Sequence, residues 1–362
     1  MSRPAALGVE EAAELEALLG QSIQSAEVLS GGRNSRVLVL GLSDDRGARP
    51  EGGRTVVAKR YARRRPPRLD PLDVEIHALR FLADHGPPNV PELLAADPVG
   101  RWAVLSEVPG RAVEAADVDD SAVDALLEFL GALDRAGHAP SALDLPPASE
   151  ASFSLDELEA DIRARLPPLR AAVDGGVDGA DQSALAYLER ELEPQLVEGV
   201  RRARQALGRA GVGPADALPE DHRRLSPSDL GFHNARLDLD GGTRRFYFVD
   251  FEYFGWDDPA KTLCDLLLHP RALIPPAGRF EIVRRRLAAL RGDTTLPHRL
   301  RAGYPLFGIK WCLILLNEFL PHARERRRLA GADSDDHGDP RPRQLQRARA
   351  LLRRLRDEPS PV

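Results

Sequence analysis

Two aspartates and an asparagine, Asp229, Asn234 and Asp250, have the side-chain types and the spacing of a site for a hard metal cation. The segments ARLDL and RRFYFV flank Asp240-Gly241-Gly242, which predicts a β-hairpin. Asn234 lies eight residues before Gly242 and Asp250 eight residues after it, so the hairpin would bring both side chains to its open end. Asp229 lies on the loop that enters the hairpin. Oxygen ligands without thiolates suit Mg2+, which also binds phosphate oxygens, whereas each residue taken alone would suit a turn or a cap.

A lysine and a glutamate, Lys59 and Glu75, form a second candidate pair. Lys59 ends the strand-like run TVVAK in a chain with only three lysines among its 50 Lys and Arg residues. A helix is predicted to begin after Asp70, an N-cap residue followed by Pro71 in the first turn, and Glu75 falls on the apolar stripe of this helix. Because a buried carboxylate needs a cation, Lys59 is its predicted partner. The alternatives are a purely structural salt bridge, or a Glu75 side chain turned outward to solvent.

The elements that must position these residues predict an α+β chain in two lobes. Strand patterns separated by polar, Gly- and Pro-rich turns dominate the region up to residue 108, and helical patterns dominate the region from 118 to 330. The predicted division is a β-rich N-terminal lobe at 1–108, a mostly helical C-terminal lobe at 109–330, and a loop with a basic helical tail at 331–362.

Composition excludes several classes of function. The formal net charge is -6 and the arginines are interspersed with acids, so no sustained basic face for nucleic acid is expected. The apolar run WCLILL is too short to span a bilayer, so no membrane segment is expected. Two cysteines in a chain of this length predict a reducing, cytoplasmic location without disulfides or a cysteine-built metal site. The motifs GxxxxGK[ST], HExxH and GxSxG are absent.

The spacing DxxxxN, followed by a hairpin and then DF, resembles the catalytic and metal segments of the protein-kinase-like fold. In detail the chain resembles the aminoglycoside phosphotransferase and choline kinase-like family of small-molecule kinases, over roughly residues 26 to 320. The segments that carry the resemblance occur in the family's order: LSGGRNSRVLVL, VVAK, VEIHALRFL, SEVPG, SDLGFHN and VDFEYFGWDDP.

This resemblance implies a bilobal protein-kinase-like fold and an ATP- and Mg2+-dependent transfer of phosphate to a hydroxyl of a small molecule. Such an acceptor would be a sugar, an amino sugar, an amino alcohol or a natural-product intermediate. Asp229 would orient or deprotonate the acceptor hydroxyl, and Asn234 and Asp250 would hold magnesium. Lys59 would contact the α and β phosphates, with Glu75 fixing it.

The resemblance also implies contacts outside this centre. Backbone groups would cover the phosphates around Gly31, Gly32, Asn34 and Ser35, and would meet adenine at Ser106, Glu107 and Val108. A helix expected at about 303–320 carries the polar residues Lys310, Asn317 and Glu318, which would either line the acceptor pocket or form the polar edge of a core helix.

Two positions depart from the family pattern. Pro227 replaces the histidine expected two residues before Asp229, and Thr262 replaces an aspartate, with Asp265 following one helical turn later, where it would either substitute for that aspartate or only face solvent. His233 is interpreted as a hydrogen-bonding residue and not as the base. These departures motivate an alternative, a catalytically inactive, pseudokinase-like nucleotide-binding module, although the five central residues are intact. A protein kinase is a weaker alternative, because the chain lacks the DFG and APE pattern.

Overall fold

The computed structural model describes residues 7–29, 35–43, 54–62, 69–176, 178–321 and 339–357. Two compact units are present, and each is described by itself. The first comprises the described parts of Met1–Ala112 and Ala235–Phe254, and the second those of Val113–Asn234, Gly255–Arg324 and His337–Val362. The predicted division at residues 108 and 330 stays a prediction.

The first unit is built on a five-stranded antiparallel sheet with the strand order β1-β2-β3-β5-β4. Two helices, α1 and α2, accompany it, whereas the second unit is mostly helical. The predicted α+β fold class is therefore confirmed. The elements of the sheet layer are α1 (Val9–Leu19), β1 (Ile23–Leu29), β2 (Ser35–Leu42), β3 (Thr55–Tyr61), α2 (Pro71–His85), β4 (Leu93–Asp97) and β5 (Trp102–Ser106).

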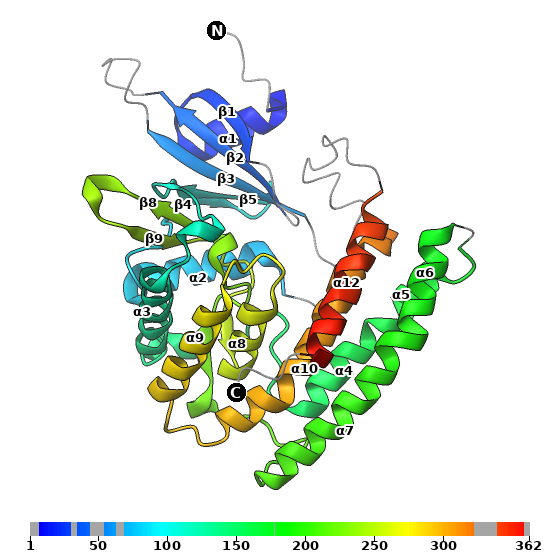
Figure 1. Cartoon of the computed structure of the whole chain (residues 1–362). Helices are drawn as coiled ribbons and strands as arrows, with labels where there is room; N and C mark the ends of the chain where they lie inside the picture. Colours follow the sequence, from blue (N-terminus) through cyan, green and yellow to red (C-terminus); the bar gives the residue numbers. More distant parts are fainter. Residues whose placement is uncertain are drawn as a thin grey trace. The chain divides into compact units, whose positions relative to one another are not determined.

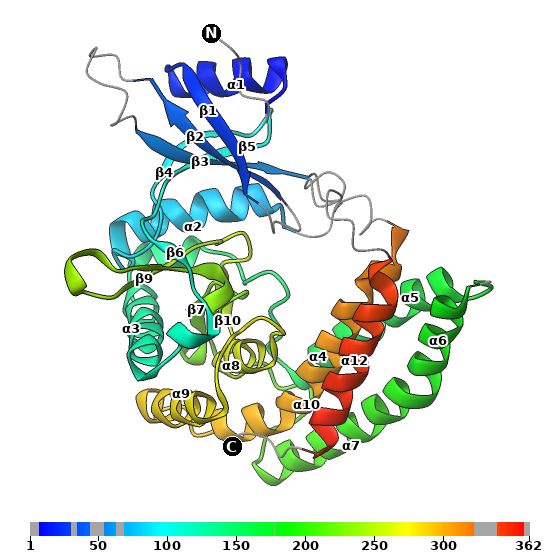
Figure 2. The ribbon, with the colours of Figure 1, turned by 45° about the horizontal axis from the view of Figure 1, so that its top comes forward.

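Strand β3 directs successive side chains to opposite faces of the sheet. Ala58 belongs to the apolar cluster in which Leu15 of α1 packs on one face. Lys59, the next residue, reaches Glu75 of α2 on the other face. The two helices thus cover opposite faces of the sheet (Figure 2). The period of two in a strand is what turns Lys59 away from the apolar cluster and toward α2.

Helix α2 begins as the sequence predicts. The Asp70 carboxylate accepts a hydrogen bond from the backbone N–H of Leu72, with Pro71 in the first turn. The same carboxylate receives both guanidinium Nη atoms of Arg101, at 2.6 and 2.8 Å. Asp70 therefore fixes the start of the helix that carries Glu75, which lies in the second turn and is fully buried.

Replacing Asp70 by alanine is expected to lower the free energy of unfolding by at least about 1 kcal/mol, because the Leu72 N–H loses its cap and the Arg101 guanidinium loses its carboxylate partner. Urea unfolding measures this change. The matched control is Asp73→Ala in the same first turn, where the side chain is exposed and accepts no capping bond from Leu72; the expected loss is less than about 0.5 kcal/mol. Equal losses in the two variants would contradict the capping role.

The first unit also holds a smaller three-stranded sheet with the order β6-β8-β9. The predicted hairpin is present and pairs Ala235 with Phe248. Its register is one residue off the symmetric pairing expected around Gly242, because residues 240–242 form a short 3-10 turn in which Gly241 and Gly242 both have positive φ. The strands are β6 (Arg111–Ala112), β8 (Ala235–Asp238) and β9 (Arg245–Phe248).

The second unit is organised around the long helix α10 (Leu296–Leu315), which packs against four other helices of the unit (Figure 1). No described helix is long and apolar enough to cross a membrane. The partners of α10 are α4 (Leu155–Ala164), α7 (Glu193–Arg209), α8 (Pro259–Leu268) and α12 (Pro340–Asp357). The remaining elements are α3 (Asp120–Ala136), α5 (Leu166–Val173), α6 (Gly179–Tyr187), α9 (Pro276–Ala289) and the paired strands β7 (Arg224–Ser226) and β10 (Gly255–Asp257).

Candidate active site

Lys59, Glu75 and Asp250 meet in the first unit. The Lys59 Nζ atom lies 2.9 and 2.7 Å from the two carboxylate oxygens of Glu75 and 2.8 Å from Oδ1 of Asp250. Glu75 also accepts the backbone N–H of Phe251 at 3.0 Å, so the helix, the strand and the segment after β9 are tied together at one carboxylate. The predicted Lys59–Glu75 pair is present, and the outward alternative for Glu75 is wrong.

The charge on Lys59 is secured by its surroundings. Burial, the strongest influence, lowers the pKa of Lys59, but the carboxylates of Asp250 and Glu75 outweigh it and hold the pKa above its ordinary value. An ammonium group has three N–H donors, and three carboxylate oxygens surround this one. Lys59 is therefore a buried, compact positive charge with one carboxylate oxygen for each of its three N–H donors.

Asp250 has an unusual backbone conformation. Its φ is 73°, in the left-handed region that non-glycine residues seldom adopt, although aspartate tolerates it better than most. Its side chain is 35% exposed, unlike that of Glu75. A locally strained acid that is held by a buried lysine and still reaches solvent suits a binding role better than a packing role.

Asp229 and Asn234 meet in the second unit. The Asn234 amide donates from Nδ2 to the backbone carbonyl of Asp229 at 2.9 Å, which leaves its oxygen, Oδ1, directed elsewhere. Burial raises the pKa of Asp229, but the hydrogen bond from His233 and the electrostatic influence of the two nearby imidazoles, His233 and His269, outweigh it and lower the pKa to about 2. Asp229 is thus an ionised carboxylate throughout the neutral pH range, with 29% of its side chain exposed.

Hydroxyl groups support the loop that carries Asp229. Ser226 Oγ accepts the backbone N–H of Ser228 at 3.0 Å and the hydroxyl of Thr262 at 3.1 Å. Thr262, one of the two departures from the expected pattern, therefore bonds to this loop, and Pro227, the other, lies within the loop and accepts the backbone N–H of Asp229 at 2.8 Å. Ser228 itself has φ 64°, so the residue before Asp229 is held in a strained conformation.

A buried lysine holds Ser228 in that conformation. Lys261 Nζ donates to the Ser228 hydroxyl at 3.0 Å and pairs with Asp257 at 2.7 Å and with Asp265 at 3.1 Å. Burial lowers the pKa of Lys261, but the carboxylates of Asp257 and Asp265 outweigh it, so the ammonium persists. Asp265 therefore does not simply face solvent: it binds Lys261 and also accepts Trp311 Nε1–H at 2.8 Å.

The predicted nucleotide contacts are only partly within the described residues. Gly31, Gly32 and Asn34 lie outside them, whereas Ser35 is buried at the start of β2. Ser106 ends β5, where its N–H donates to the Glu92 carbonyl and its hydroxyl accepts the Glu92 N–H, each at 2.9 Å. Glu107 and Val108 follow it, and Val108 is buried.

The predicted acceptor contacts lie at the end of α10. Lys310 is buried and pairs with Glu150 at 3.2 Å and Asp161 at 3.5 Å. The α-helix ends at Leu315, earlier than expected, and Asn317 and Glu318 follow in a 3-10 turn at Leu316–Phe319. Glu318 is buried and Asn317 is half-buried. Contact of these residues with an acceptor stays a prediction.

The sequence did not identify two residues that surround Asp229 and its loop. These residues are His269, just after α8, and Lys261, one of the three lysines of the chain. The composition offers one signal: Lys59 and Lys261 are two of only three lysines in an arginine-rich chain, and both are buried and paired with carboxylates. His269 follows the helix that begins at the Asp-Pro pair and has no comparable local signal.

The chain matches the model of a known family, the phosphotransferase enzyme family, over residues 25–302. No curated protein matches the sequence. Similar solved structures include an ethanolamine kinase from Plasmodium vivax, with 12% identity and a TM-score of 0.58 over 92% of this chain and 82% of that one. The gentamicin complex of APH(2'')-IIa has 14% identity and a TM-score of 0.57, covering 97% of both chains.

A third structure is spectinomycin phosphotransferase APH(9)-Ia in complex with ADP and spectinomycin, with 10% identity and a TM-score of 0.53 over 94% of this chain and 97% of that one. At these identities the structures support the fold. The family resemblance predicted from the sequence and the expected class, a phosphotransferase, are confirmed by the match over residues 25–302.

Proposed function

Because the chain belongs to the phosphotransferase enzyme family, we propose that it transfers the γ-phosphate of ATP to a hydroxyl of a small molecule with the help of Mg2+. The observation that carries this proposal is the buried Lys59 ammonium held between Glu75 and Asp250. A buried ionic group of this kind is costly to maintain as a mere structural bridge, and phosphate oxygens are the ligands for which a compact ammonium is suited.

Asp250 and Asn234 are the residues proposed to hold magnesium. The Asp250 carboxylate and the Asn234 amide oxygen are hard oxygen ligands, and the Nδ2 bond to Asp229 orients the Asn234 amide. Bound there, the ion would neutralise charge on the phosphates. Lys59 would bind the α and β phosphates with the N–H that points to Asp250 in this structure, while Glu75 keeps the other two.

Asp229 would receive the proton of the acceptor hydroxyl. The hydroxyl oxygen forms a bond to the γ-phosphorus, the bond from that phosphorus to the bridging oxygen of ADP breaks, and the proton passes to the Asp229 carboxylate. With a pKa of about 2 this carboxylate is a weak base. That is acceptable because phosphoryl transfer depends mainly on positioning and on charge stabilisation.

The remaining assignments complete the proposal. Backbone groups around Gly31, Gly32, Asn34 and Ser35 would cover the phosphates, and those of Ser106 to Val108 would meet adenine. Lys310, Asn317 and Glu318 would border the acceptor, with Lys310 sharing its charge with Glu150 and Asp161. Two buried free cysteines, Cys264 and Cys312, accord with the proposed cytoplasmic location.

The acceptor class is proposed from the neighbours in fold. The solved structures include an ethanolamine kinase and proteins solved with gentamicin and with spectinomycin. Ethanolamine, gentamicin and spectinomycin are all small molecules that carry hydroxyl groups. We therefore propose amino alcohols, sugars, amino sugars and related natural products as the compounds to examine first.

The test is phosphoryl transfer by the purified protein. Mg-ATP is incubated with a panel of amino alcohols, sugars and aminoglycosides, while phosphorus NMR follows new phosphate esters and a coupled assay follows ADP. We expect ester formation with at least one acceptor, and its loss when EDTA removes magnesium. Tight ATP binding without consumption of ATP by any acceptor would favour the inactive nucleotide-binding module instead.

A further inference from the structure

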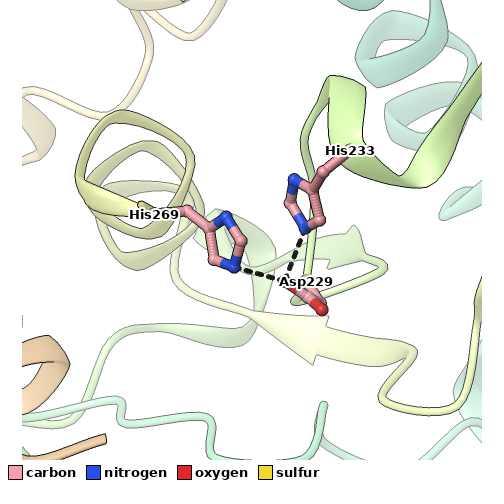
Figure 3. A group of neighbouring side chains, drawn as sticks. All are labelled: Asp229, His233 and His269. Atoms are coloured by element: carbon pink, nitrogen blue, oxygen red, sulfur yellow. Dashed lines mark hydrogen bonds and ion pairs between the residues drawn. The ribbon is translucent and has the colours of Figure 1, made fainter. Parts of the chain in front are cut away.

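Asp229, His233 and His269 form one compact group in the second unit (Figure 3). Oδ1 of Asp229 lies 3.2 Å from Nε2 of His233 and 3.7 Å from Nε2 of His269. The two imidazole rings stack, with 3.8 Å between their centroids and 11° between their planes. Both histidines thus approach the same oxygen of the carboxylate to which the proposed function assigns the acceptor proton.

The hydrogen bonds of the rings assign their tautomers. The backbone N–H of Arg271 donates to Nδ1 of His269 at 3.1 Å, so Nδ1 is the acceptor nitrogen and Nε2 carries the hydrogen. Nδ1 of His233 is buried and has no hydrogen-bond partner among the described residues, while its Nε2 faces a carboxylate oxygen. A lone pair in that place would repel the oxygen, so Nε2 of His233 also carries the hydrogen. Both rings therefore turn an Nε2–H toward Oδ1 of Asp229, that of His233 within hydrogen-bond distance at 3.2 Å and that of His269 just beyond it at 3.7 Å.

A metal ion bound by the three side chains does not fit this arrangement. A histidine binds a metal through the in-plane lone pair of an unprotonated nitrogen. Ligation through Nε2 of His269 would place the hydrogen on Nδ1, against the Arg271 N–H. Nearly parallel rings stacked at 3.8 Å also have no common point in their planes where one ion could sit.

We propose that His233 and His269 are positioning residues that hold Oδ1 of Asp229 and present Oδ2 to the acceptor hydroxyl. This inference rests on the proposed function. The hydrogen bond from His233, together with the Nε2–H of His269 that faces the same oxygen from 3.7 Å, restricts rotation of the carboxylate about its Cβ–Cγ bond. The same donors weaken the carboxylate as a base, so the benefit lies in orientation, on which a loose phosphoryl-transfer transition state depends.

The surroundings of the ring pair are built to keep it in place. A Cβ atom on Gly231 would lie 2.6 Å from Nδ1 of His233, so glycine at this position leaves the space that the ring occupies. The indole of Trp311 contacts His269 edge to face, at 4.7 Å between centroids and 83° between planes. Trp311 is in turn anchored by its hydrogen bond to Asp265. The histidine pair therefore lies between a glycine and an anchored tryptophan.

The test compares His269→Phe with His269→Gln. Phenylalanine keeps a flat ring for the stack and for Trp311 but has no donor, whereas the glutamine amide offers an N–H near the place of Nε2. For His269→Phe we expect kcat to fall about 10-fold while KM for ATP stays within about 2-fold, because the nucleotide contacts are unchanged. His269→Gln should recover most of the lost kcat. Thermal unfolding of both variants checks that they remain folded.

The outcomes separate this inference from the proposed function. Equal kcat for the wild type and His269→Phe, or a glutamine variant no better than the phenylalanine variant, would overturn the positioning role and leave the phosphotransferase function standing. Absence of transfer by the wild type with every acceptor would overturn the proposed function itself. If His269→Phe does not fold, His233→Phe and His233→Gln provide the same comparison at the shorter of the two contacts, 3.2 Å.

Discussion

Replacing Asp229 by asparagine is expected to lower kcat for phosphoryl transfer by about 10²- to 10⁴-fold, the usual contribution of a positioned proton acceptor. Asparagine has nearly the same shape, and its amide oxygen can still accept the hydrogen bond from Nε2 of His233 and face Nε2 of His269. What it lacks is the second, negatively charged oxygen. The loss should therefore appear in kcat, with the fold intact.

Two controls make the Asp229→Asn result specific. KM for ATP should stay within about 3-fold, because the proposed nucleotide contacts do not include Asp229. Asp221→Asn makes the same chemical change at an exposed residue of the same unit, and its kcat should match that of the wild type. Steady-state measurement of ADP release with the identified acceptor supplies both constants. Full turnover by Asp229→Asn would remove Asp229 from the mechanism.

The parts of the site that follow from short-range patterns could be predicted from the sequence. The alternation in β3 points Lys59 away from the apolar cluster, the N-cap at Asp70 sets the phase that turns Glu75 inward, and the glycines of the turn define the hairpin after Asn234. Each inference needs only the period of one element and its end signals. The pairing of Lys59 with Glu75 then follows because a buried charge requires a partner.

The support around Asp229 could not be predicted in the same way. His269 lies forty residues after Asp229, and its approach depends on how α8 ends and on how Trp311 of α10 packs against it. The tautomer of His269 depends on one backbone N–H, that of Arg271. Such contacts are set by tertiary packing, which no local period encodes. The hydrogen bond from the Thr262 hydroxyl to the Ser226 hydroxyl likewise depends on the packing of α8 against β7.

Replacing Lys59 by methionine is expected to lower the free energy of unfolding by about 3 to 5 kcal/mol, the cost of leaving a buried charge without its partner. Glu75 is fully buried. In this variant it would lose both bonds from Lys59 and keep the bond from the Phe251 N–H. Urea unfolding measures the change. Arg60→Met removes a positive charge from the next residue of the same strand, where the side chain is 39% exposed, and should cost less than about 1 kcal/mol.

The double variant Lys59→Met/Glu75→Gln separates the cost of the orphaned charge from loss of packing. Glutamine keeps an oxygen for the Phe251 N–H, so the double variant should regain about 2 kcal/mol or more relative to Lys59→Met, while phosphoryl transfer stays abolished. A double variant as unstable as the single one would mean that packing, and not charge, dominates.

Lys59→Arg completes the series. Three carboxylate oxygens lie within 2.9 Å of one nitrogen, a geometry that a planar guanidinium cannot reproduce, so transfer should fall at least about 10-fold although the positive charge is retained. Undiminished transfer by Lys59→Arg would show that charge alone suffices, and the chain's retention of lysine among its many arginines would then have no explanation in this site.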